Sequence, residues 1–172
     1  MKINKKWLTI TIICLILTIG SLAGFRIFSG KTEGIEDVSI STGNQNKCLA
    51  YDKENAMIFV GTHDNQLVAF KDDQELWRVS ANGPFSELVL DSENDLIYAG
   101  NEDGNIYAYQ EMDGKLKETI NVQRRVVSID LSKDGSKVAA ATSTGSSKAN
   151  VLVYNTADGS ELVNNKYTVA IT

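Results

Sequence analysis

Side chains able to do chemistry are few in this sequence, and they are scattered. His63 is the only histidine, and no second ligand stands near it at the spacing of a metal site. The turns "NEDGN" (residues 101–105) and "SKDGS" (residues 132–136) carry carboxylates, but they lack the ligand order of a calcium-binding loop. No nucleophile elbow, phosphate-binding loop or paired-thiol motif is present. We therefore predict that the protein is not an enzyme and binds no cofactor or metal ion.

The two cysteines stand in different surroundings. Cys14 lies within an uncharged apolar run, and Cys48 lies well beyond it. If the run is in a membrane, the two cannot pair, so we predict no disulfide even in an oxidising compartment. Cys48 is expected to pack as a small apolar side chain.

The apolar run predicts a membrane segment at the N-terminus. Residues 7–25 read "WLTITIICLILTIGSLAGF", and Lys2, Lys5 and Lys6 precede them. As a helix this run would be roughly 28 Å long, close to the hydrocarbon thickness of a bilayer. We predict that residues 1–28 anchor the protein in the cell membrane, with the N-terminus inside and the rest extracytoplasmic. Two alternatives stay open, a signal peptide cleaved near Ala23, which would leave the protein secreted, and a buried core helix.

Charge separates this segment from the rest of the chain. All 22 Asp and Glu residues follow position 28, together with 13 of the 17 Lys and Arg residues. An acidic domain repels phosphate backbones, so nucleic acid is excluded as a partner. Residues 29–47 are rich in Gly, Ser, Thr and Asn, a composition typical of a flexible tether.

The remainder of the chain repeats itself. The stretch "IFVGTHDNQLVAF" (residues 58–70) returns 39 positions later as "IYAGNEDGNIYAY" (residues 97–109). One inserted residue then pairs Leu76 with Leu116. A third copy spans residues 126–162, with four extra residues within 142–150. Each copy reads as four short strands separated by polar turns, and the Asp-Gly pairs predict hairpins with type I′ turns.

A tandem repeat of four strands over about 40 residues is the signature of a β-propeller blade. One four-stranded sheet covers neither of its faces, and stacking the sheets buries both. We predict an all-β domain over residues 48–172, with blades at about 48–82, 83–124 and 125–165 and the first strand of a fourth at 166–172. This incomplete ring would expose one flank of the first blade and the last strand. A chance run of hairpins in a β-sandwich is the alternative.

Two features of the repeat make predictions about the core. Gly61 and Gly100 follow equivalent strands, and at least one of them is expected to have either a positive φ or a close backbone neighbour. One alternating face of the third strands should be buried: Leu67, Ala69, Ile106, Ala108, Val151 and Val153.

The repeats resemble those of a known family. The stretches "GTHDNQLVAFKDDQELW" (residues 61–77) and "GNEDGNIYAYQEMDGKL" (residues 100–116) are similar to quinoprotein-like (PQQ-like) propeller repeats. The third copy, "VVSIDLSKDGSKVAAA", looks closer to WD40-type repeats, with Lys133 where proline is usual. The resemblance implies the propeller fold over residues 48–172. It does not imply the dehydrogenase activity of longer relatives, because this chain lacks their adjacent cysteines and has too few blades to enclose a quinone.

The propeller resemblance leaves binding as the predicted activity. Loops joining the second and third strands of a blade should share one edge with the connections between blades, and loops on a rigid scaffold often carry recognition. The candidate interaction residues on this edge are Thr62, His63, Asp64, Asn82, Phe85, Asn101, Glu102, Asp103, Ser146 and Lys148.

From these features we predict a membrane-anchored, extracytoplasmic scaffold that binds a protein partner or itself, similar in kind to quinoprotein-like assembly factors of cell envelopes. The chain would be either a truncated product of a longer gene or one that completes its ring with another polypeptide. A ligand-binding or sensory module, or part of a quinoprotein-type enzyme completed by another chain, is the alternative function.

Overall fold

The computed structural model describes residues 41–143 and 148–168. The predicted membrane segment and most of the predicted tether lie outside these residues. Within them, no helix has the length and apolar character needed to cross a membrane.

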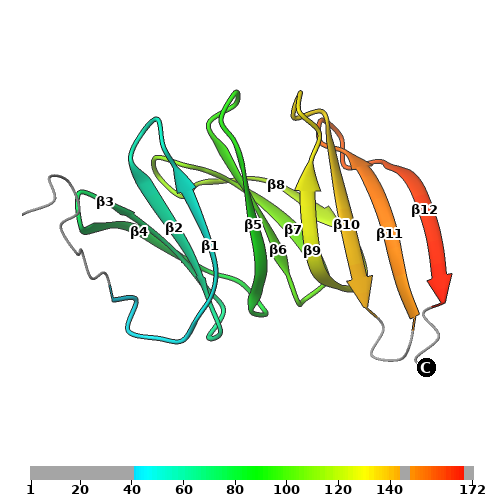
Figure 1. Ribbon diagram of the computed structural model, residues 1–172, viewed down its shortest axis with the longest axis horizontal. Coiled ribbons are helices and arrows are strands. Elements are labelled where there is room, and N and C mark those ends of the chain that lie inside the picture. Colours follow the sequence, from blue (N-terminus) through cyan, green and yellow to red (C-terminus); the bar gives the residue numbers. More distant parts are fainter. Residues whose placement is uncertain (1–40, 144–147, 169–172) are drawn as a thin grey trace, which may run out of the picture. The chain divides into compact units, whose positions relative to one another are not determined.

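All of the described strands belong to three four-stranded antiparallel sheets, as predicted for an all-β repeat protein (Figure 1). In each sheet the strands are ordered as they follow one another along the chain. The first sheet contains β1 (Asn46–Asp52), β2 (Met57–Thr62), β3 (Gln66–Lys71) and β4 (Gln74–Ser80). The second contains β5 (Phe85–Asp91), β6 (Leu96–Asn101), β7 (Asn105–Gln110) and β8 (Leu116–Asn121). The third contains β9 (Arg125–Leu131), β10 (Lys137–Ser143), β11 (Lys148–Asn155) and β12 (Glu161–Thr168).

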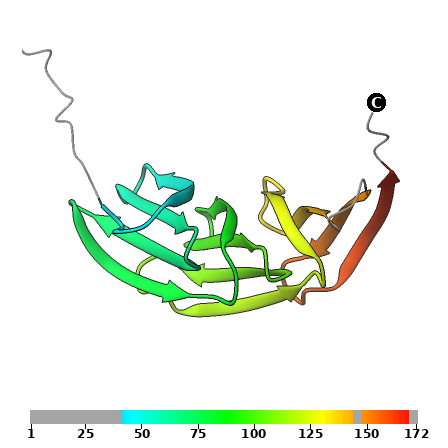
Figure 2. The same cartoon turned by 90° about the horizontal axis from the view of Figure 1, so that it is seen from below.

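The three sheets stack face to face like neighbouring blades. The first strand of each sheet packs on the sheet before it, so that β5 contacts β1 and β2, and β9 contacts β5 and β6. Figure 2 shows the sheets side by side in an open arc, which is the predicted unclosed ring. Stacking therefore buries the sheet faces as the repeat predicted, because the two faces that meet at each junction form a core.

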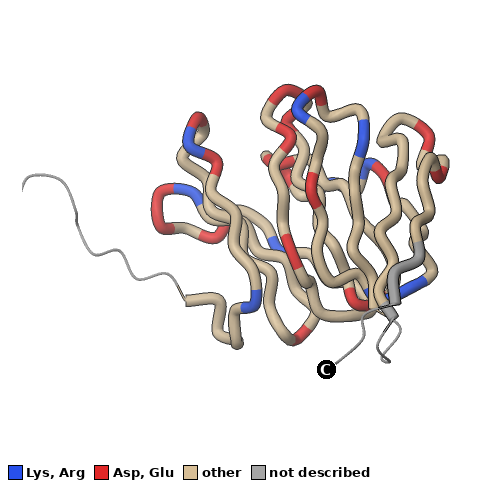
Figure 3. Tube along the Cα trace, turned by 45° about the vertical axis from the view of Figure 1, so that its right-hand side comes forward, with Lys and Arg blue, Asp and Glu red and all other residues tan. Residues whose placement is uncertain are grey.

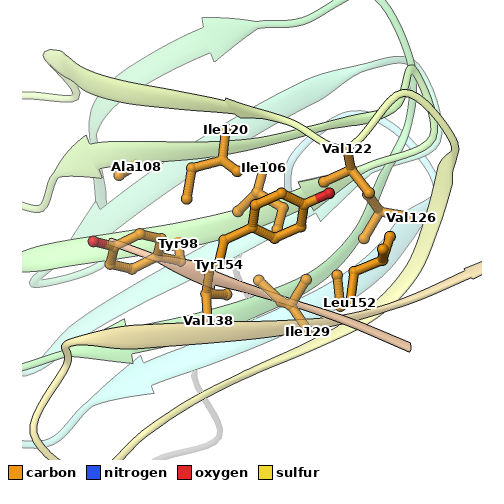
Figure 4. Close-up of a cluster of buried hydrophobic side chains, with 11 residues drawn as sticks. Tyr98, Ile106, Ala108, Ile120, Val122, Val126, Ile129, Val138, Leu152 and Tyr154 are labelled. Carbon is orange, nitrogen blue, oxygen red and sulfur yellow. The ribbon is translucent and has the colours of Figure 1, made fainter. Parts of the chain in front are cut away.

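Two separate cores fill the two junctions between sheets. Phe59, Leu67, Phe85 and Ile97 are fully buried between the first and second sheets. Cys48 packs against this cluster as predicted, and burial raises the pKa of its thiol to about 11. Between the second and third sheets, side chains of both point toward one another (Figure 4). This second core comprises Tyr98, Ile106, Ala108, Ile120, Val122, Val126, Ile129, Val138, Ala140, Leu152 and Tyr154.

Gly61 and Gly100 do have close neighbours and neither has a positive φ, but the nearest atoms belong to side chains and not, as predicted, to the backbone. A Cβ atom on Gly61 would lie 2.8 Å from Cβ of Phe85, and one on Gly100 would lie 2.9 Å from Cγ1 of Val126. Both contacts cross a junction to the next sheet. Glycine is therefore required here because any side chain would push the sheets apart.

The predicted type I′ turns do not form at the Asp-Gly pairs. Gly104 and Gly135 have positive φ values of 95° and 65°, but the aspartate before each has none, whereas a type I′ turn needs a positive φ at both central residues. These longer loops instead end on a single left-handed glycine. The two-residue loop between β3 and β4 does have two successive positive φ values, 49° at Asp72 and 63° at Asp73.

The predicted buried face is wrong for the third sheet. Leu67, Ala69, Ile106 and Ala108 are buried, but Val151 is 39% exposed and Val153 is only partly buried. In β11 the buried residues are Leu152 and Tyr154. The alternation itself is intact, but Val151 and Val153 lie on the face that points away from the second sheet, and no described sheet covers that face.

Strand pairing also corrects the alignment of the fourth strands. Trp77 pairs with Ala69, and Glu118 pairs with Ala108. Ala108 follows Ala69 by 39 positions, whereas Glu118 follows Trp77 by 41. Glu118 is therefore the counterpart of Trp77, and the second repeat has two inserted residues in this turn where one was predicted.

The predicted start of a fourth blade at residue 166 is wrong, because the third sheet continues at least to Thr168. Residues 166–168 form the end of β12 and pair with residues 148–150 of β11. Residues 169–172 lie outside the described part of the chain.

Candidate interaction edge

The loops expected to share an edge of the arc do so, held by backbone hydrogen bonds. The Ala81 amide, in the connection between the first two sheets, donates to the Asn65 carbonyl in the β2–β3 loop (2.9 Å). The Glu102 amide in the β6–β7 loop donates to the Pro84 carbonyl (2.9 Å). The Val122 amide donates to the Gly104 carbonyl (2.9 Å). We call this the loop edge, formed by residues 62–66, 81–84, 101–105 and 122–124.

The candidate residues differ in accessibility along the loop edge. His63, Asp64 and Asn82 are exposed, whereas Glu102 and Asp103 are partly buried. Thr62, Phe85 and Asn101 are fully buried, and Phe85 belongs to the first core. Ser146 and the side chain of Lys148 lie outside the described part of the structure. Of the described candidates, only the exposed and partly buried side chains are presented to solvent.

Polar side chains of the β6–β7 loop hold that loop in place. Asn101 donates through Nδ2 to the Gly83 carbonyl (2.7 Å) and accepts from the Asp103 amide (2.9 Å). Asp103 in turn accepts from the Tyr107 hydroxyl (2.6 Å). Burial and this bond to Asp103 together raise the pKa of Tyr107 to about 12. The buried polar groups are therefore satisfied internally and fix the loop backbone.

Glu102 links the first, second and third sheets through charge. Its carboxylate accepts from Arg125 Nη2 (2.8 Å) and pairs with Lys47 Nζ through the same oxygen. Arg125 belongs to β9 and Lys47 to β1, so one carboxylate spans both junctions. The hydrogen bonds from Arg125 and then Lys47 lower the pKa of Glu102 to about 2.

The opposite edge of the arc contains a buried carboxyl group that sequence reasoning missed. Glu111 is 1% exposed, and its Oε1 atom has no hydrogen-bond partner. Burial, followed by the charge of Asp52, raises the pKa of Glu111 to about 7. The Trp77 indole donates to the Glu111 carbonyl across the junction (2.7 Å). An aspartate at the same strand end in two repeats, Asp52 and Asp91, was the available signal.

A groove of about 680 Å³ opens at this opposite edge between the second and third sheets. Asp91, Tyr98, Lys117, Glu118 and Thr156 are among its lining residues. Glu118 stands here in the position that Trp77 fills at the first junction. A bulky indole therefore closes one junction, and a shorter carboxylate leaves the other open.

Charge is concentrated at the strand ends. Figure 3 shows most Asp and Glu residues in the turns, while the strands between them carry few charged side chains. In the described part of the chain, no three His, Cys, Asp or Glu side chains are grouped so as to hold a metal ion. The arrangement offers two polar edges and a rigid apolar interior, which suits recognition of another molecule.

Stacked four-stranded sheets of this kind define a β-propeller repeat protein. The family model described as "Outer membrane protein assembly factor BamB" matches residues 29–170. The chain belongs to this family of PQQ-like β-propeller repeat proteins. No curated protein sequence matches it significantly.

Solved structures share the fold at low sequence identity. The computationally designed Ika4 protein is 18% identical with a TM-score of 0.65, over 77% of this chain and 79% of Ika4. Hydrazine synthase of Kuenenia stuttgartiensis is 15% identical with a TM-score of 0.66, over 72% of this chain and 38% of that one. The Cps50 (Swd1) β-propeller domain of Myceliophteria thermophila is 14% identical with a TM-score of 0.60, over 69% of this chain and 40% of that domain. These similarities establish the fold alone, since propellers host many unrelated functions.

Proposed function

We propose that this chain is a membrane-anchored scaffold that binds a partner protein through its loop edge, outside the cytoplasm. The observation that carries this proposal is the loop edge itself. His63, Asp64 and Asn82 are exposed there on loops whose backbones are hydrogen-bonded to their neighbours. A preorganised loop loses little conformational entropy on binding, which favours affinity.

The family match supports the binding of a partner protein, and the sequence supports the membrane anchor. The matching family is named for an assembly factor of the outer membrane, a role that depends on binding other proteins. The uncharged residues 7–25, with lysines before them and an acidic domain after them, support a membrane anchor with an extracytoplasmic domain. We further propose that the chain acts without catalysis and without nucleic acid.

Site-specific photo-crosslinking in intact cells tests the role of the loop edge. A photoreactive amino acid replaces His63 or Asn82 on the loop edge, and Lys53 or Met112 on the opposite edge as controls, since all four are exposed. We expect one discrete crosslinked species from both loop-edge positions and none from the two controls. Equal crosslinking from both edges, or none from the loop edge, would refute the assignment.

A further inference from the structure

The first junction shows which kind of group fills the space between two sheets at the edge opposite the loop edge. The Trp77 indole packs on the β7–β8 turn, where a Cβ atom on Gly114 would lie 2.7 Å from Cδ2 of the indole. Its Nε1 atom donates to the Glu111 carbonyl in the same turn (2.7 Å). Its ring centroid lies 5.9 Å from that of Phe59. One planar group therefore meets a glycine turn, a carbonyl oxygen and an aromatic ring at once.

The groove at the second junction presents the same three surfaces. Gly159 has a φ of 67°, against 68° at Gly114, and the amide of each glycine donates to the carbonyl four residues before it (2.9 and 3.0 Å). Thr156, three residues before Gly159, supplies a carbonyl at the position of the indole's acceptor in the first junction. Tyr98 supplies the aromatic ring, because strand pairing makes it the counterpart of Phe59. The groove therefore suits a planar group that donates hydrogen bonds.

Charge decides which planar group suits this groove. Glu118 stands in the position of Trp77, but a carboxylate cannot donate a hydrogen bond to the Thr156 carbonyl. A Cβ atom on Gly159 would lie 3.6 Å from Oε1 of Glu118, so the carboxylate lies beside the turn. In the part of the chain that the structure describes, no Lys or Arg forms an ion pair with Glu118. Burial, followed by the charge of Asp158, raises the pKa of Glu118. The groove thus holds a partly buried acid that a cation would stabilise.

We propose that this groove binds a small guanidino acid, with the guanidinium group of the ligand in the place that the indole fills at the first junction. A guanidinium is planar and donates through several N–H groups at fixed angles, so it can pair with Glu118 and bond to the Thr156 carbonyl together. A cation beside the Tyr98 ring adds cation–π attraction.

The size of the groove and its remaining charges fit such a ligand. The volume of about 680 Å³ lies in the range of small-molecule sites. Asp91 lies in the lining and adds negative potential, whereas Lys117, also in the lining, suits a carboxylate at the other end of the ligand. The groove lies on the edge opposite the loop edge, so this proposal does not depend on a partner protein bound there.

Isothermal titration calorimetry of the full-length chain in detergent micelles, with L-arginine as the probe, tests the proposal. We expect saturable binding with a dissociation constant of about 1 mM or below. L-citrulline has the same shape but carries a neutral urea group, so it should bind about tenfold more weakly or less. Glu118→Gln should weaken the binding of arginine by a similar factor. Glu54→Gln, at an exposed position in the β1–β2 turn, removes the same charge far from the groove and should leave binding unchanged.

Glu118→Trp tests the position of the ligand. Its indole should fill the groove as Trp77 fills the first junction, so we expect this variant to bind no arginine. Urea denaturation of both Glu118 variants should give midpoints equal to or above that of the natural protein, which separates lost binding from lost folding. No saturable binding of arginine to the natural chain, equal affinity for arginine and citrulline, or binding that survives Glu118→Trp would each overturn the proposal.

Discussion

Replacing Glu111 by glutamine should change how the stability of the protein depends on pH. Glu111 is buried beside Asp52, with Asp91 and Asp95 adding to the negative potential. Its pKa is raised from 4.5 to about 7, so the folded chain holds a proton that the unfolded chain releases. For a group with a raised acid pKa, the free energy of unfolding falls as pH rises from about 4.5 to about 7, and stays lower above that range.

The size of the effect follows from the shift. Each pKa unit corresponds to about 1.4 kcal/mol, so ionising Glu111 lowers the free energy of unfolding by up to about 3 kcal/mol between pH 4.5 and 8. Glutamine keeps the shape of the side chain but cannot ionise. We expect Glu111→Gln to be more stable than the natural protein at pH 8 and to lose most of the fall in stability with pH.

Urea denaturation of the full-length chain in detergent, followed by tryptophan fluorescence at pH values from 5 to 8, measures this difference. Trp77 reports directly, because its indole donates to the Glu111 carbonyl. Glu93→Gln, at an exposed position, controls for removal of a negative charge. If Glu111→Gln and the natural protein show the same slope of stability against pH, the raised pKa is refuted.

Other predictions concern the junctions, the loop edge and topology. Gly100→Ala should cost about 1–3 kcal/mol of stability by overpacking against Val126, whereas Ala141→Gly should cost no more than about 1 kcal/mol, as measured by urea denaturation. Equal losses would contradict the close approach at Gly100. Glu102 has its pKa lowered to about 2, so its ion pairs should stabilise the fold above about pH 4.5 and lose that effect as pH falls toward 2; Glu102→Gln should flatten this acid limb by no more than about 1 kcal/mol. An unchanged acid limb in the variant would argue against the pairing. Protease added to intact spheroplasts should degrade the region after residue 40; complete protection until lysis would exclude an extracytoplasmic domain.

The repeat made the architecture predictable, because it records burial at regular intervals. Copies of one four-strand pattern about 40 residues apart leave stacking as the way to cover both faces of each sheet. Gly61 and Gly100 could be read in the same manner, since a glycine at the same place in two repeats indicates a close neighbour. The edge shared by the loops also followed from the repeat, because it depends only on the order of strands along the chain.

The candidate site was less predictable than the fold. Phe85 and Asn101 stand in or next to turns in the sequence, yet both are buried, because the strands reach further into the loop edge than the turn residues suggest. For Glu111 the available sequence signal was indirect, namely the aspartate that ends the first strand in two repeats (Asp52 and Asp91), since a glutamate in a turn is normally solvated. Its raised pKa arises from burial and then from the charge of Asp52, 59 positions away in the sequence, and only the stacking of two sheets produces both.

By itself, the sequence determined which residues alternate and how often the pattern returns, because these are properties of the backbone period and of local turn chemistry. Only the tertiary structure decided which of the two alternating faces is covered. Val151 and Ile106 occupy the same place in their repeats, but Ile106 has a sheet packed over it and Val151 is 39% exposed. The difference is physical, because burial depends on the neighbour that a face meets and not on the residue type that the face presents.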